Sequence, residues 1–356
     1  MSLEELRHKA LAAFMARVLN IHAEEDVVPR GGLLQPHHEG RRYSMFHYNV
    51  VIPDLPEPHR FLACAVLAGR TGTLVFDDDP VVAGTPRNTA TLALGTAATA
   101  PDGFHVYDMR TDCDLAPDGS HLQFGQELII TGTFPDFHVV VHQGDLTLDL
   151  RATCTDQITS FIRSAVYDHV GYPARYEGEL TWQGETRPVS GVLSLEYARA
   201  ASLAGFRDRV VPPRLKLPWN LFTYHVIKTS PDTLLMLASC EAWGEHLSTT
   251  AYLKQVDGAS ERHLRNVEFD VLSYRDEEQV APDGRRMKVP ERFRWRILDE
   301  DGAPSTEIVG SVDTELIYGL GRGWIGGYFY EGHHEGEAVS GDAYFEYVDV
   351  PTSAGA

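Results

Sequence analysis

The sequence has few cysteines and no long apolar run. Its 356 residues include four cysteines, none of which forms a CxxC pair. That number is small for a disulfide-linked scaffold, so we interpret Cys64, Cys113, Cys154 and Cys240 as buried thiols in a reducing cytoplasm. The apolar runs are shorter than the ~18–20 residues that a membrane helix needs. The first twenty residues begin with acidic side chains and mix both charges, which a secretory signal does not.

Positive charge is also scarce. Acidic residues outnumber basic ones by 51 to 31, which gives a formal net charge of -20. Such a field repels polyanions, so we do not expect a nucleic-acid partner. The chain is too long for one simple core, and two domains are the natural expectation.

Familiar catalytic motifs are missing as well. The sequence contains no P-loop, HExxH or serine nucleophile elbow. GRGWIG, residues 321–326, fits G-x-G-x-x-G, but strand-like GYFYEG follows it where a dinucleotide fold needs a helix. His37-His38-Glu39 and His333-His334-Glu335 lie beside glycines and charges, and adjacent strand residues point to opposite faces, so we expect no metal site.

The sequence is instead rich in strand patterns. In LTLDLRAT, residues 146–153, leucine or alanine alternates with polar side chains, which predicts a strand with one buried face. Three copies of Ala-Pro-Asp-Gly predict turns. The exception is an N-terminal amphipathic helix, for which we predict a buried face made of Leu3, Leu6, Ala10, Phe14 and Val18.

Several motifs occur twice in the same order. Tyr-Glu-Gly, Val-Ser-Gly and Glu-Tyr end both halves, with Glu196 and Glu346 at equivalent positions. MFHYNV from Met45 resembles LFTYHV from Leu221, which pairs Tyr48 with Tyr224 and places Cys64 opposite Cys240. We therefore predict a duplicated β unit whose closing hairpin has Val-Ser-Gly at a turn or bulge.

These repeats define the predicted organisation of the chain. We expect an N-terminal helix and lead-in over 1–30, a first barrel over 31–200 and a linker over 201–217. A second barrel follows over 218–350, and residues 351–356 form a tail. The fold class is all-β, with two tandem barrels of a size that suits eight to ten strands each.

A family resemblance rests on the first and last strands predicted for each half. The opening stretches are YSMFHYNVVI and PWNLFTYHVI, and the closing stretches are YEGELTWQGETRPVSGVLSLEY and YFYEGHHEGEAVSGDAYFEY. The chain resembles the two-domain lipocalin-like (calycin) family over about residues 40–350. That family includes AttH-like proteins, carotenoid hydratases of the hydroxyneurosporene synthase type and lipocalin-like Diels–Alderases. The resemblance implies tandem lipocalin-like barrels, a bulky apolar ligand and chemistry without an organic cofactor.

Polar and aromatic side chains on the predicted strands are the candidate site residues. A barrel interior lined in this way can stack on a polyene or ring and donate hydrogen bonds. The candidate ligand-binding residues are Tyr48, Trp243, His246, Trp295, Tyr328 and Tyr330. The candidate catalytic residues are Glu346, Glu196, Tyr224 and His225. A carboxyl in a dry pocket has a raised pKa and can act as a general acid.

Three functions fit these residues. The first is a cofactor-independent hydratase or isomerase, in which a buried acid protonates an alkene. The second is a pericyclic cyclase that holds a flexible chain, with Tyr224 or His225 donating to a carbonyl. The third is a non-catalytic intracellular carrier. We rank an enzyme above a carrier because the chain is doubled and poor in cysteine, and we keep a homodimer open as an assembly.

Overall fold

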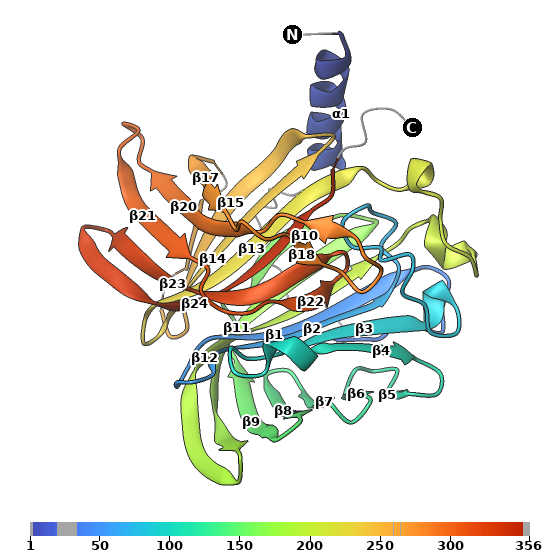
Figure 1. Ribbon diagram of the computed structural model, residues 1–356, viewed down its shortest axis with the longest axis horizontal. Coiled ribbons are helices and arrows are strands. Elements are labelled where there is room, and N and C mark those ends of the chain that lie inside the picture. Colours follow the sequence, from blue (N-terminus) through green and yellow to red (C-terminus); the bar gives the residue numbers. More distant parts are fainter. Residues whose placement is uncertain (1–2, 20–33, 259, 264, 352–356) are drawn as a thin grey trace.

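The computed structural model describes residues 3–19, 34–258, 260–263 and 265–351. Within these residues the fold consists of antiparallel strands and one α-helix, α1 (Leu3–Leu19) (Figure 1). Two large sheets curl into barrel-like shapes that lie against each other. The predicted all-β class is therefore confirmed. Residues 20–30 of the predicted lead-in, residues 31–33 of the predicted first barrel and residues 352–356 of the predicted tail lie outside the described residues.

The first sheet contains twelve strands in the order β4-β3-β2-β1-β12-β11-β9-β8-β7-β6-β5, with β10 paired to β11. Their bounds are β1 (Met45–Leu55), β2 (Arg60–Gly69), β3 (Thr89–Gly95), β4 (Phe104–Asp108), β5 (Cys113–Leu115), β6 (His121–Phe124), β7 (Leu128–Thr133), β8 (Asp136–Gln143), β9 (Leu146–Cys154), β10 (Thr159–Arg163), β11 (Tyr167–Trp182) and β12 (Glu185–Ala200).

The second sheet contains ten strands in the order β16-β15-β14-β13-β24-β23-β21-β20-β17, with β22 paired to β23. Their bounds are β13 (Trp219–Ser230), β14 (Thr233–Ala242), β15 (Glu245–Gln255), β16 (Ser260–His263), β17 (Val267–Tyr274), β20 (Pro290–Leu298), β21 (Pro304–Ser311), β22 (Ile317–Leu320), β23 (Gly323–His334) and β24 (Glu337–Asp349). A separate small hairpin joins β18 (Gln279–Val280) to β19 (Arg286–Met287).

The two sheets share one central arrangement, in which the first strand of each half pairs with the last strand of that half. In the first sheet Asn49 lies opposite Glu196, and in the second Tyr224 lies opposite Glu346. If the two glutamates are equivalent, Asn49 corresponds to Tyr224. The predicted pairing of Tyr48 with Tyr224 is therefore wrong by one residue, and a one-residue slip exchanges the two faces of a strand.

The same slip separates the two cysteines that the repeat had paired. Cys64 lies in the core inside the first sheet, whereas Cys240 lies in the apolar layer between the sheets. Gene duplication itself stays a prediction from the sequence.

The repeated closing motifs lie within long strands rather than at a turn. Tyr176 is in the middle of β11 and faces Gly191 of β12, and Tyr330 of β23 faces Gly341 of β24 in the same way. A Cβ at Gly191 would approach the Tyr176 ring to 3.2 Å. The Val-Ser-Gly glycines therefore leave room for a cross-strand tyrosine ring, and the predicted turn or bulge is wrong.

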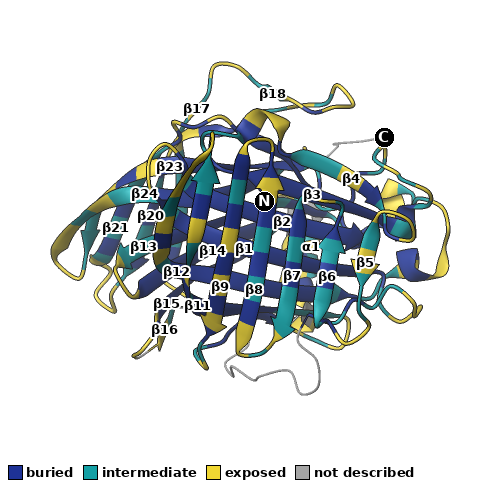
Figure 2. Cartoon of the chain, turned by 90° about the horizontal axis from the view of Figure 1, so that it is seen from below, coloured by how far each residue is buried: buried dark blue, intermediate teal, exposed yellow. Residues whose placement is uncertain are grey.

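Three apolar layers hold the fold together. One lies inside each curled sheet, and the third lies between the two sheets. On β1, Tyr48 and Val50 point into the first core while Val51 points into the layer between the sheets. Figure 2 shows buried residues along the central strands and exposed residues mainly at strand ends and loops. Long parts of β1 and β13, and the second halves of β12 and β24, are therefore buried on both faces, unlike β9, whose predicted alternation is confirmed.

The N-terminal helix is present, but its buried face differs from the prediction. Ala12 and Met15 are buried as α1 packs on β15, whereas Phe14 is 66% exposed and Val18 is 48% exposed. The small Ala12 side chain lies at the contact. No helix among the described residues has the length and apolarity needed to cross a membrane.

Candidate functional site

A mostly apolar cavity lies between the two sheets. Its volume is about 60 Å³. A single water needs about 10–15 Å³, so the cavity has room for several waters, and a larger guest requires side chains to move. It is lined by Met45, His47, Leu67, Phe76, Phe161, Ile162, Tyr167, His169, Glu196, Trp219, Phe222, Tyr224, Ala238, Cys240, Ser248, Thr250, Tyr252, Leu320 and Glu346.

Two buried glutamates stand out in this apolar lining. Glu196 is 2% exposed and Glu346 is 3% exposed. Each lies on the last strand of its sheet, and its side chain points away from its own barrel core because neighbouring residues such as Leu195 and Phe345 point inward. The second sheet covers this outer face of the first, so both carboxyls are removed from water.

Each carboxyl is hydrogen-bonded from the opposite sheet. The Tyr224 hydroxyl donates to Glu196 Oε1 at 2.6 Å, and the Asn49 amide donates to Glu346 Oε1 at 2.9 Å. Asn49 and Tyr224 are the equivalent residues identified by the strand register. The two halves therefore exchange hydrogen-bond donors at a pseudo-symmetric pair of carboxyls.

A second donor for each glutamate comes from the residue two positions earlier. Ser194 Oγ donates to Glu196 Oε1 at 3.1 Å, and the Tyr344 hydroxyl donates to Glu346 Oε1 at 2.6 Å. Among the described residues no hydrogen bond reaches Glu346 Oε2. That oxygen is therefore the one available to carry a proton.

The surroundings of Glu346 favour its protonated form. Burial, and then the charge of Glu196, raise the pKa of Glu346 to about 8, although hydrogen bonds from Tyr344 and Asn49 oppose the shift. A carboxyl with this pKa holds its proton at neutral pH. Burial and the nearby Glu196 also raise the pKa of Tyr224 well above its ordinary value, so its hydroxyl remains a donor.

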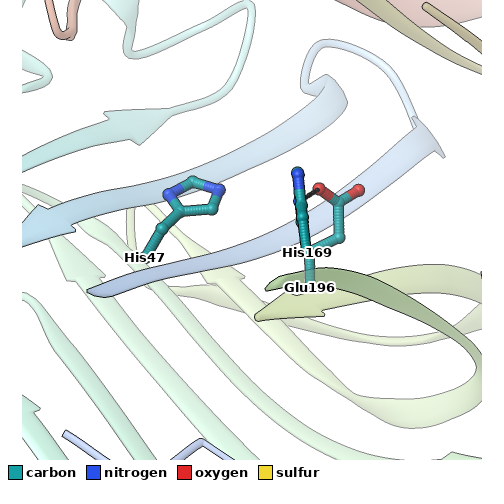
Figure 3. Close-up of side chains that lie close together, drawn as sticks. All are labelled: His47, His169 and Glu196. Carbon is teal, nitrogen blue, oxygen red and sulfur yellow. Dashed lines mark hydrogen bonds and ion pairs between the residues drawn. The ribbon is translucent and has the colours of Figure 1, made fainter. Parts of the chain in front are cut away.

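Two histidines distinguish the Glu196 wall of the cavity. His169 Nε2 lies 3.3 Å from Glu196 Oε2, and the rings of His47 and His169 are nearly perpendicular, with centroids 5.8 Å apart (Figure 3). Burial, followed by the charge of His169, lowers the pKa of His47 to about 4 despite the opposing effect of Glu196. The ligating atoms of all three side chains lie within 4.8 Å of one another.

The sequence profile of the family described as "Family of unknown function (DUF6670)" matches residues 65–355. The chain belongs to this family. No curated protein matches the sequence.

Comparison with solved structures shows the fold of this chain. A protein from Nitrosomonas europaea, provisionally called AttH, has a similar structure with a TM-score of 0.56 and 14% identity, over 91% of this chain and 99% of that one. CghA in complex with Sch210972 gives a TM-score of 0.46 and 11% identity, over 91% of this chain and 93% of that one. The similarity to the Nitrosomonas europaea protein shows that this DUF6670 chain has a tandem lipocalin-like fold.

The cavity brings together three of the ten residues proposed from the sequence. Glu346, Glu196 and Tyr224 all line it. His225 does not, because it lies one position beyond Tyr224 and points into the second barrel. There its ring packs 4.7 Å from Phe293 and its Nδ1 lies 3.2 Å from the Tyr328 hydroxyl.

The six proposed ligand-binding residues lie elsewhere. Tyr48 is in the first core, where its hydroxyl donates to the Leu34 carbonyl, while Trp295, Tyr328 and Tyr330 belong to the second core. Trp243 occupies a turn with φ of 56° and stacks on His8 of α1. His246 is exposed on β15, and its Nε2 lies 2.8 Å from the Thr249 hydroxyl.

Sequence reasoning missed His47, Asn49 and His169. His47 and Asn49 flank the chosen Tyr48 in MFHYNV, so the correct register would have placed them between the sheets. His169 had no such signal, because it lies in a run without clear alternation at the start of β11.

Proposed function

We propose that this protein binds an apolar small molecule between its two sheets and transfers a proton to it from Glu346. The reaction class is a hydration, isomerisation or cyclisation that uses no organic cofactor. The observation that carries the proposal is a buried carboxyl that lines an apolar cavity, has one oxygen without a hydrogen-bond donor and has a pKa raised to about 8. The small cavity volume favours a slender isoprenoid, polyene or polyketide chain over a thick ring system.

The aromatic lining supports the charge change that protonation produces. When Glu346 protonates one alkene carbon, the positive charge develops on its neighbour, and an aromatic face close by stabilises a cation. Phe161, Tyr224 and Tyr252 form such a group, with ring centroids 5.6 Å and 5.3 Å from Phe161. In a hydration, water then adds to the cation and returns a proton to Glu346. In an isomerisation, loss of a different proton completes the reaction.

A carrier function is the alternative. The number of apolar side chains that line the cavity, among them Leu67, Phe76 and Ile162, favours it, because a carrier needs only such surface. Under this alternative Glu346 would be part of the packing between the sheets and would take no part in a reaction.

Native mass spectrometry of protein purified from its own host would identify a co-purified apolar molecule. That molecule is then incubated with protein in D₂O and in H₂¹⁸O. Deuterium uptake reports protonation, and ¹⁸O uptake separates hydration from isomerisation or cyclisation. Glu346→Gln should slow the reaction about 100- to 10,000-fold, the usual contribution of a positioned acid. Unchanged return of the molecule, with normal binding, would support the carrier.

A further inference from the structure

Two histidines and a carboxylate converge on one wall of the cavity. His47 comes from β1, His169 from β11 and Glu196 from β12, so three adjacent strands of one sheet supply them (Figure 3). Two imidazoles and one carboxylate are a donor set used by zinc and by non-haem iron. We propose that His47, His169 and Glu196 form a binding site for a divalent transition-metal ion, with zinc as the best match.

The hydrogen bonds of His47 leave the correct nitrogen available. Its Nδ1 lies 2.7 Å from the Val66 carbonyl oxygen, which can only accept. Nδ1 therefore carries the hydrogen, and the neutral ring presents the Nε2 lone pair. Metal-binding histidines usually donate their other N–H to a carbonyl or carboxylate in this manner.

Glu196 is oriented in a comparable way. Its Oε1 is occupied by Tyr224 and Ser194, so Oε2 is left to face His169 at 3.3 Å. Two ligands of a tetrahedral zinc ion lie roughly 3.3–3.5 Å apart when each bond is about 2.0–2.2 Å. The His169–Glu196 pair already has that spacing. Without a metal this contact is a hydrogen bond in which His169 Nε2 donates to the carboxylate, so a bound ion would take the place of that hydrogen and the ring would carry its hydrogen on Nδ1. All three ligating atoms lie within 4.8 Å, so side-chain movements of about an ångström would complete the triad.

The second sheet lacks the same set. By register, the position equivalent to His47 is Phe222, and the position equivalent to His169 is Gly323. Glu346 thus has no imidazole at either place and bonds to Asn49 and Tyr344 instead. Pseudo-symmetric packing explains why a carboxyl occurs in each half, but it gives no reason for two histidines beside only one of them. A metal site on the Glu196 wall does give a reason.

The proposed site goes beyond the function proposed above. It places a metal ion at Glu196 of the first sheet, whereas the proposed acid, Glu346, belongs to the second sheet. Binding of that ion requires no substrate. The cavity side of the triad is where water or a substrate oxygen would occupy the remaining position on the ion.

The test is direct metal binding by the full chain. Protein stripped with a chelator is titrated with Zn²⁺ by calorimetry and with Co²⁺ by visible absorption. We expect one Zn²⁺ per chain and the absorption of a tetrahedral cobalt complex. Loss of an outer partner of a zinc ligand typically weakens affinity about 10- to 100-fold. His47→Ala and His169→Ala, which remove ligands, should therefore weaken it more than about 100-fold, and Ser194→Ala about 10-fold.

Controls separate this site from other histidines and from the proposed reaction. His138→Ala removes an exposed histidine on β8 and should bind Zn²⁺ as the wild type does. Glu346→Gln should keep zinc binding even where it abolishes turnover, so the two proposals can fail separately. Glu196→Gln keeps the side-chain size and should lose affinity if the alanine variants do not fold. Absence of stoichiometric Zn²⁺ and Co²⁺ binding in the wild type, or equal affinity in all variants, would overturn the proposal.

Discussion

Replacing Glu346 with glutamine should remove a large pH dependence from the stability of this protein. The folded-state pKa of Glu346 is about 8, whereas its ordinary value is 4.5. The folded protein therefore holds this proton more tightly than the unfolded chain does. Its stabilising effect is complete below pH 4.5 and is lost as the pH rises through 8.

The magnitude follows from the difference between the two pKa values. At about 1.4 kcal/mol for each pH unit, the total loss is about 5 kcal/mol, of which about 4 kcal/mol falls between pH 5 and pH 9. Glutamine resembles the protonated carboxyl and can still accept from Asn49 and Tyr344 through Oε1. The Glu346→Gln variant should therefore lack this loss while keeping the packing between the sheets.

The measurement is the free energy of unfolding in urea at several pH values from 5 to 9, for wild type and Glu346→Gln. Other ionisable groups face the same layer in both proteins, so the difference between the two curves is the quantity of interest. These groups are His47, Tyr167, His169, Glu196, Tyr224, Cys240, Tyr252 and Tyr344. Glu337→Gln, an exposed change at the start of β24, should follow the wild type. Parallel curves for wild type and Glu346→Gln would refute the reasoning.

Two further predictions concern the same cavity. Asn49→Leu removes a hydrogen bond that holds the pKa of Glu346 down, so the pH at which stability and any turnover decline should move upward. Urea unfolding at several pH values measures the pH midpoint of the stability loss, and the same midpoint in variant and wild type would contradict this prediction. Ala238→Trp places a large ring in the cavity and should abolish uptake of a fluorescent polyene, measured by fluorescence titration, while the same change at exposed Ala13 of α1 should not.

The fold class could be predicted because a strand with one solvent-exposed face alternates apolar and polar residues in its sequence. In β9, leucines alternate with Thr147, Asp149 and Arg151, and the structure has that alternation. The turn motifs and the repeated sequence motifs predicted an architecture of two β units. The helix was also predictable, although its buried face was not, because small Ala12 makes the contact while larger Phe14 faces solvent.

The site was less accessible to prediction because its strands are buried on both faces. From Met45 to Pro53 every residue of β1 is buried, so the sequence carries no contrast between the side facing the core and the side facing the other sheet. Tyr48 was proposed because it is an aromatic side chain on an apolar strand, and the repeat alignment that paired it with Tyr224 was one residue out of register. Contacts such as Asn49 with Glu346, 297 positions apart, leave no local pattern in the sequence.

The exchange of donors between the sheets makes the two halves of the chain dependent on each other. A fragment that ended after β12 would expose the broad apolar outer face of its sheet, with Glu196 deprived of Tyr224 and Asn49 deprived of its acceptor. Such a face invites self-association, so selection against aggregation would act on both halves jointly. A substitution in one half is therefore tolerated only where the other half still supplies the matching hydrogen-bond partner and apolar surface.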